Sequence, residues 1–145
     1  MRGRTIRAVL ALVAASLAAA CGTRKDLPFA PDTGVPDPEA TFARVEKEIL
    51  TPSCAVAGCH TGAAPAGGLD LSAGRAYASI VHAPAVESPS LARITPGDPE
   101  RSYLVKKVRG DGDISGGRMP LGGPYLSPMK IRLLIDWVRR GAPLD

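Results

Sequence analysis

The sequence predicts an all-α fold, a small helical domain with long glycine-rich loops that follows a signal peptide and a proline-rich tether. Four segments repeat apolar residues at helical spacing, and no segment convincingly alternates apolar and polar residues as a half-buried strand would. The 145 residues suffice for one small domain and are too few for two. Aromatic residues make up only 4% of the chain, so a core built from protein alone would be thin.

Residues 1–20 are expected to be a secretory signal peptide. Arg2, Arg4 and Arg7 precede an uncharged stretch at residues 8–20. This stretch is too short to span a membrane, because about 20 residues are needed to cross roughly 30 Å of hydrocarbon. Most of the excess positive charge lies in this leader. The rest of the chain shows no basic face of the kind that nucleic-acid-binding domains carry.

The leader ends in small residues that run directly into Cys21. This arrangement resembles a bacterial lipobox, in which the cysteine is diacylated and becomes the first residue of the mature protein, although Ala18 stands where the usual leucine would be. A diacylated Cys21 would tie the protein to a membrane surface without a spanning helix. The alternative is an ordinary signal peptide that leaves Cys21 as a free thiol. Gly22 replaces the aspartate that typically retains lipoproteins at the inner membrane, so the resemblance implies a periplasm-facing lipoprotein of the cell envelope, with the outer membrane preferred.

Residues 21–37 are predicted to form an extended tether, because Pro28, Pro31 and Pro36 recur among polar residues without an apolar period. The folded domain is expected to occupy residues 38–145. The tether would hold this domain away from the membrane surface.

The first helix of the domain is predicted at residues 38–50, with Asp37 as its N-cap and Thr51-Pro52 as its end. A second, short helix is predicted at residues 73–81, capped by the preceding serine. The apolar positions of these two helices are Phe42, Val45, Ile49, Leu50, Ile80 and Val81.

Two further helices are predicted from their terminal signals. The third begins behind an Asp98 cap and ends at Gly110, and the fourth begins with Ser127-Pro128 and ends at Gly141. The fourth carries the clearest apolar period, at Ile131, Leu134, Ile135 and Val138. Glycine-rich loops are expected at residues 62–68 and 110–123.

The segment that indicates chemistry follows the first predicted helix, where Cys54 and Cys59 precede His60 directly. A Cys-x-x-Cys-His sequence is the attachment signature of a c-type haem. Two thiols add to the haem vinyl groups as thioethers, and the adjacent histidine ligates the iron. Here four residues, rather than two, separate the cysteines. The intervening residues are small enough to bulge, and some c-type cytochromes carry four, so the wider spacing is compatible with the same chemistry.

A candidate for the second iron ligand lies in the loop at residues 116–120, where Met119 follows His60 by 59 residues. A thioether ligand favours reduced iron and raises its potential. An apolar helix, the Cys-Cys-His sequence, a middle helix, a Met-Pro loop and a C-terminal helix ending in Trp-x-x-x-Gly-Ala follow one another. In this order the chain resembles a class I c-type cytochrome domain, of the divergent kind found in bacterial lipoproteins. The resemblance covers residues 38–143.

The resemblance implies a haem c cofactor bound covalently by Cys54 and Cys59, with His60 as the proximal and Met119 as the distal iron ligand. It implies a one-electron carrier rather than an enzyme, because both axial positions of the iron are filled. The expected partners are periplasmic redox proteins and, through the Cys21 anchor, a membrane, with no nucleic acid.

The resemblance also implies that the first and last helices cross near the haem edge. Phe42 on the first helix and Trp137 on the last are the candidates for that contact. The large planar cofactor would complete the thin core.

Other interpretations of the same residues stay open. Cys54 and Cys59 could form a disulfide in a haem-free lipoprotein that acts as a structural or interaction module. A zinc site lacks a clear fourth ligand, since His82 is the only other histidine. His82 could replace Met119 as the sixth ligand, and Met119 could simply pack in the core. An iron with an open position, as in a peroxidase, would need Met119 unbound and finds no acid–base group in support.

The basic residues Lys106, Lys107 and Arg109 are predicted to be a solvated helix end. Steering of an acidic redox partner is the alternative function for these charges.

Overall fold

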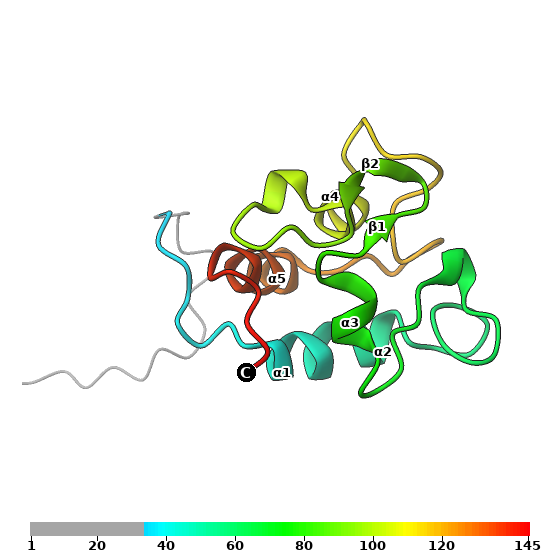
Figure 1. The fold of residues 1–145 in the computed structure, drawn as a ribbon, viewed down its shortest axis with the longest axis horizontal. Helices are drawn as coiled ribbons and strands as arrows, with labels where there is room; N and C mark the ends of the chain where they lie inside the picture. Colours follow the sequence, from blue (N-terminus) through cyan, green and yellow to red (C-terminus); the bar gives the residue numbers. More distant parts are fainter. Residues whose placement is uncertain (1–33) are drawn as a thin grey trace, which may run out of the picture.

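The structure of the protein, a computed structural model, describes residues 34–145. The predicted signal peptide, Cys21 and most of the predicted tether lie outside these residues. In chain order the elements are α1 (Phe42–Val45), η1 (Glu46–Leu50), α2 (Thr51–Ser53), η2 (Ala66–Gly68), α3 (Ala76–Ile80), β1 (Pro84–Ala85), β2 (Ser88–Ala92), η3 (Pro99–Arg101), α4 (Tyr103–Arg109) and α5 (Pro128–Arg139) (Figure 1).

The prediction of an all-α fold is wrong, because β1 and β2 form a two-stranded antiparallel sheet beside the helices. These strands contain prolines and small polar residues and do not alternate in burial, so their own sequence does not predict them. Contacts with the rest of the fold hold the hairpin instead. The backbone N–H of Ile94, just after β2, donates to the carbonyl of Ile80 at the end of α3 over 2.9 Å.

The first helix runs without a break in helical backbone through α1, η1 and α2, from Phe42 to Ser53. Its N-cap is Thr41, whose Oγ1 accepts from the Arg44 N–H over 3.2 Å. The predicted cap, Asp37, instead accepts from the Glu39 N–H in a preceding turn. The predicted end at Thr51-Pro52 is also wrong, because the helical backbone continues through Pro52 to Ser53. The helix therefore ends directly before Cys54.

The next two predicted helices are confirmed with shifted starts. Residues 72–75 form a turn rather than helix, so α3 is only five residues long. The Asp98 cap is confirmed, because its Oδ1 accepts from the Arg101 N–H over 3.1 Å. It begins the 3-10 turn η3, which Ser102 separates from α4. Gly110 ends α4 in the left-handed conformation, with φ of 80°.

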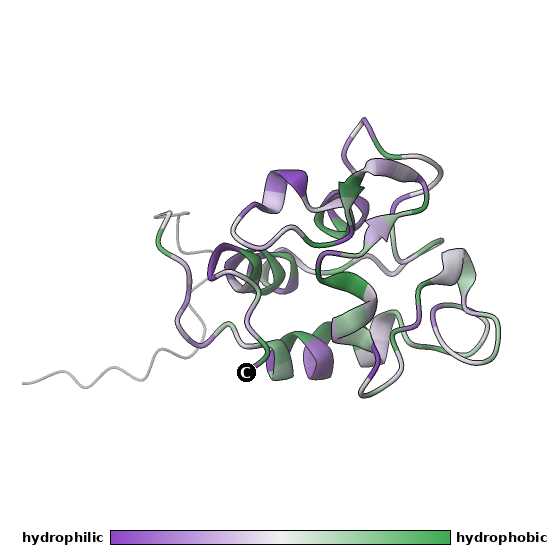
Figure 2. Cartoon of the chain, viewed as in Figure 1, coloured by the Kyte–Doolittle hydropathy of each residue, from purple (hydrophilic) through white to green (hydrophobic). Residues whose placement is uncertain are grey.

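Helix α5 has the boundaries that its sequence predicts. Ser127 Oγ accepts from the Lys130 N–H over 3.4 Å, and Pro128 occupies the first turn. Gly141 follows the helix with φ of 92°, a backbone conformation that favours glycine. Figure 2 shows hydrophobic and hydrophilic residues alternating around the turns of α5, as expected of a helix buried on one face. Its fully buried residues are Leu134, Trp137 and Val138.

The first and last helices meet at Phe42 and Trp137, as the resemblance implies. Their ring centroids lie 5.6 Å apart, and Tyr77 from α3 completes the cluster in an edge-to-face arrangement, with its ring centroid 5.1 Å from that of Phe42. Trp137 Nε1 donates to the carbonyl of Pro143 over 2.9 Å. The same end of the chain is attached to α1, because Asp145 Oδ1 accepts from the Phe42 N–H over 2.9 Å.

Candidate functional site

The two cysteines and His60 lie in one loop that closes on itself directly after α2. The Cys54 N–H continues the helix by donating to Leu50, and the His60 N–H donates back to the Cys54 carbonyl over 3.2 Å. The Ala66 N–H then donates to the Cys59 carbonyl over 2.9 Å. These backbone hydrogen bonds close the loop that carries Cys54, Cys59 and His60. The structure keeps the three residues in one loop, but it does not group their side chains into a three-ligand metal site.

The imidazole of His60 is fixed by its Nδ1 atom, which lies 3.1 Å from the carbonyl oxygen of Ala66 in η2. A carbonyl can only accept a hydrogen bond, so Nδ1 is the donor and carries the proton. In the neutral ring Nε2 then holds the free lone pair. A histidine held in this way through one nitrogen is oriented to bind a metal with the other.

Both thiols are free in the structure, so it does not contain the alternative disulfide. Cys54 is half-buried and packs against the hydrophobic core, whereas Cys59 is exposed. Burial raises the pKa of the Cys54 thiol to about 11, with a further rise from the nearby Cys59 and a partial offset from Lys130. Cys54 therefore stays protonated at neutral pH.

We expect a thiol-alkylating reagent to modify Cys59 before Cys54 in haem-free protein. A rise from 9.0 to about 11 lowers the thiolate fraction of Cys54 about a hundredfold, and the thiolate is the reacting form. Peptide mapping after a timed iodoacetamide pulse should show Cys59 reacting at least about tenfold faster, because part of the thiolate difference is offset by the higher nucleophilicity of a more basic thiolate. The Cys59→Ser variant isolates the slow reaction of Cys54. Equal rates at the two positions would contradict the burial of Cys54.

Met119 lies half-buried against the core, and α4 fixes its backbone. Its N–H donates to the Lys107 carbonyl over 2.9 Å, and the neighbouring Arg118 Nε donates to the Val108 carbonyl over the same distance. The described residues hold a set of half-buried hydrophobic side chains packed on the outside of the core. They are Cys54, Ala55, Leu69, Tyr77, Val81, Leu104, Met119, Ile131 and Ile135. Two predicted haem-binding residues with sulfur atoms, Cys54 and Met119, thus each pack against the hydrophobic core.

A polar network joins the Met119 loop to the β1–β2 hairpin. Lys107, which is buried, places its Nζ 2.8 Å from Glu87 Oε2 and 2.7 Å from the Ser115 carbonyl. Tyr103 donates its hydroxyl to the same Glu87 oxygen over 3.0 Å and accepts from the Ser115 N–H over 3.0 Å. We call these four residues the Lys107 network. One lysine thus holds the loop through both its backbone carbonyl and its side chain.

Glu87 is the member of the Lys107 network on which the charge of His60 acts. The bond from Lys107 lowers the pKa of this carboxyl most, and the Tyr103 hydroxyl, the Lys107 charge and the His60 imidazole lower it further, while burial opposes them. The charge of His60 therefore acts on a carboxylate that Lys107 also binds. The loops that carry His60 and Met119 both lie on the right-hand side of the view in Figure 1.

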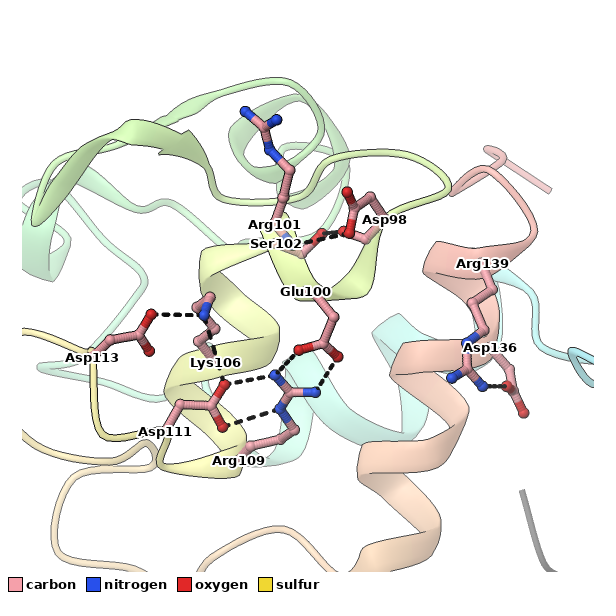
Figure 3. Close-up of polar contacts among 10 residues, drawn as sticks. All are labelled: Asp98, Glu100, Arg101, Ser102, Lys106, Arg109, Asp111, Asp113, Asp136 and Arg139. Atoms are coloured by element: carbon pink, nitrogen blue, oxygen red, sulfur yellow. Dashed lines mark hydrogen bonds and ion pairs between the residues drawn. The ribbon is translucent and has the colours of Figure 1, made fainter. Parts of the chain in front are cut away.

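The positive charges of α4 are paired within the domain rather than left for a partner (Figure 3). Lys106 Nζ lies 2.8 Å from Asp113, and Arg109 contacts Glu100 and Asp111, each at 2.6 Å. The predicted solvated helix end is wrong for the buried Lys107. The steering alternative finds no unpaired group among these three cations.

His82 and the pockets of the described residues are the remaining candidates for a ligand site. His82 is exposed and has a left-handed backbone with φ of 58°. Within residues 34–145 no three His, Cys, Asp or Glu side chains are grouped to hold a metal ion, so the zinc alternative gains no support. Pockets of about 430 and 240 Å³ are lined by neither His60 nor Met119. None of the described helices combines the length and the apolar character needed to cross a membrane.

Sequence reasoning did not identify Glu87, Tyr103 or Ser115 as site residues, nor Arg93, whose side chain reaches η2. These residues contact the site from segments distant in sequence, and no local pattern marks them. Comparison of the chain with models of protein families, with curated proteins and with solved structures found no match.

Proposed function

We propose that the chain is an exported, membrane-anchored, monohaem protein similar to c-type cytochromes, which binds haem covalently and transfers one electron at a time. The orientation of His60 is the observation that carries this proposal. His60 follows Cys59 directly in the sequence. Its Nδ1 donates a hydrogen bond to the Ala66 carbonyl, which leaves Nε2 as the atom that could bind a metal. Diacylation of Cys21 would supply the anchor, and periplasmic redox proteins would be the electron partners.

The residues present suit a haem by their chemistry. Cys54 and Cys59 are free thiols, which can add across two vinyl groups so that each S–H proton moves to carbon and a thioether forms. An imidazole nitrogen from His60 and a thioether sulfur from Met119 are the axial pair of high-potential c-type haems. Cys54 and Met119 are each half-buried against the hydrophobic core, which would give both sulfur atoms an apolar environment. When bound, the haem supplies one-electron redox chemistry, and the chain supplies ligands, orientation and exclusion of water.

Expression of the full chain together with a c-type cytochrome maturation system tests the proposal. We expect an intact mass increased by one whole haem, haem staining that survives denaturing electrophoresis, and a sharp reduced alpha band. The Cys54→Ser/Cys59→Ser double variant is the matched control and should lose the covalent haem while keeping the signal and tether. Colourless protein whose mass is lower by two hydrogens would instead establish the disulfide-stapled, haem-free module.

The sixth ligand is tested by replacing Met119 with alanine. We expect the haem to stay attached, because both cysteines are intact, and the reduction potential to fall by more than about 59 mV, a tenfold change in a one-electron equilibrium. Redox titration of the reduced band measures this shift. Met129→Ala is the matched control, because Met129 is 67% exposed in the first turn of α5. An unchanged potential in Met119→Ala, together with a changed one in His82→Ala, would transfer the ligand role to His82.

A further inference from the structure

Arg93 follows β2 directly and reaches the loop that holds His60. Its Nη1 donates to the carbonyl of Ser79 in α3 over 2.8 Å. Its Nη2 donates to the carbonyls of Gly67 and Gly68 in η2, over 3.0 and 3.4 Å. One guanidinium thus connects the hairpin, α3 and η2.

The Arg93 guanidinium has these carbonyl partners but no anionic partner in the described part of the chain. Burial lowers the pKa of Arg93, and no carboxylate of residues 34–145 lies within ion-pair distance. A partly desolvated charge is costly unless its donors are satisfied. Here backbone carbonyls of η2 and α3 accept these hydrogen bonds. The contact that holds η2 therefore requires the partial desolvation of the Arg93 guanidinium.

The side chains of η2 itself do not hold it in place. Gly67 and Gly68 both have φ of 61°, and a Cβ built at either position would meet no atom within 4 Å. No residue of η2 is buried. Yet Ala66, the first residue of this turn, accepts the hydrogen bond from His60 Nδ1 and donates its own N–H to Cys59. A shift of η2 would therefore move the acceptor that orients the imidazole.

We infer that Arg93 is a positioning residue for the His60 imidazole: by holding η2 through Gly67 and Gly68, it fixes the Ala66 carbonyl that selects the Nδ1-protonated ring. The role of Nε2 as an iron ligand rests on the proposed function. The orientation of the ring by Arg93 does not, because it exists in the chain without haem. The fork of the guanidinium matters as much as its charge, because it bonds to two segments at once.

Haem-free protein provides the first test, with Arg93→Met, Arg93→Lys and the matched control Arg101→Met, which removes an exposed arginine without a contact to η2. Nitrogen-15 NMR of histidine reports the tautomer of His60, and hydrogen exchange reports the amides of residues 66–69. Arg93→Met should mix the two tautomers and speed exchange at least about tenfold, and Arg93→Lys, which keeps the charge but not the fork, should do the same. Arg101→Met should match the wild type.

An unchanged tautomer and unchanged exchange in Arg93→Met would overturn the inference. If this variant does not fold, Arg93→Lys decides in the same way.

Haem-loaded protein separates this inference from the proposed function. In Arg93→Met we expect a smaller low-spin fraction of the bound haem than in the wild type, because the His60 ring would be less firmly oriented. Wild-type protein that never takes up haem would defeat the proposed function and leave the NMR result standing. Normal haem uptake with wild-type exchange, tautomer and low-spin fraction in Arg93→Met would defeat the Arg93 role alone.

Discussion

Replacing Trp137 with alanine is expected to lower the free energy of unfolding by about 3–5 kcal/mol, the usual cost of truncating a fully buried aromatic residue. Trp137 is 0% exposed and contacts Phe42 and Tyr77, so alanine would leave a cavity where α5 meets the first helix. It would also release the Pro143 carbonyl from the indole N–H. Urea denaturation followed by circular dichroism measures the loss.

Two further variants make this result specific. Tyr125→Ala removes an aromatic residue that is 53% exposed and lies over Arg118, and should cost no more than about 1 kcal/mol. Trp137→Phe keeps a ring but loses the bond to Pro143, and its loss should lie between those of the two alanine variants. Equal losses for Trp137→Ala and Tyr125→Ala would contradict the packing of the two helices.

Replacing Lys107 with methionine is expected to destabilise the domain by about 1.5–3 kcal/mol, the range for hydrogen bonds to charged groups. Methionine keeps the apolar stem but loses the Nζ contacts with Glu87 and the Ser115 carbonyl. Hydrogen exchange should quicken at the amides of Ser115 and Met119, since these residues are held by the Lys107 network. Denaturation and exchange mass spectrometry measure the two effects.

Lys106→Met is the matched control for this prediction. Its Nζ pairs with Asp113, whose side chain is 62% exposed, and surface pairs of this kind contribute about 0–1 kcal/mol. The amides of Ser115 and Met119 should keep their exchange rates in this variant, because Lys106 reaches the loop through Asp113 and not through the Lys107 network. Similar losses of stability in the two lysine variants would show that the Lys107 network does not hold the loop.

The pH dependence of the Lys107→Met loss follows from Glu87. Its pKa is lowered from 4.5 in the folded protein, so its contribution is fully present above the unfolded pKa and disappears as the pH falls through the lowered folded pKa. The wild type therefore loses the stabilisation from the Glu87–Lys107 pair in acid. Lys107→Met lacks this pair at every pH. The difference in stability between them should be constant near neutral pH and shrink below about pH 4.5.

The sequence predicts the parts of the fold whose signals are local. Helix α5 has the expected boundaries because its cap, its proline and its final glycine all act within one turn of its ends. The sequence does not determine where the first helix starts, because Asp37 and Thr41 are both of a residue type that caps helices. Only the structure shows that Thr41 is the N-cap. The hairpin was not predicted because its strands have no apolar–polar period, and the segment after β2 is held by a hydrogen bond from Ile94 to the end of α3.

The candidate site likewise contains residues that a local motif reveals and residues that only the fold brings to it. Cys54, Cys59 and His60 are adjacent enough for a motif to reveal their loop. The residues that fix this loop and the Met119 loop come from β2, the hairpin turn and α4, so only the three-dimensional structure brings Arg93, Glu87 and Lys107 to them. Their chemical types, an arginine, a glutamate and a lysine, are common on any surface and carry no signal alone.

If the chain binds haem as proposed, the attachment of Asp145 to Phe42 bears on how its electrochemistry could be measured. Residue 145 and the start of the first helix lie together at the lower left of Figure 1, and the His60 and Met119 loops lie at the opposite side. A protein immobilised on an electrode through residues that precede the first helix would thus turn these loops toward the bulk solution. A linker fused after Asp145 would crowd the immobilised side and leave the approach to both loops clear.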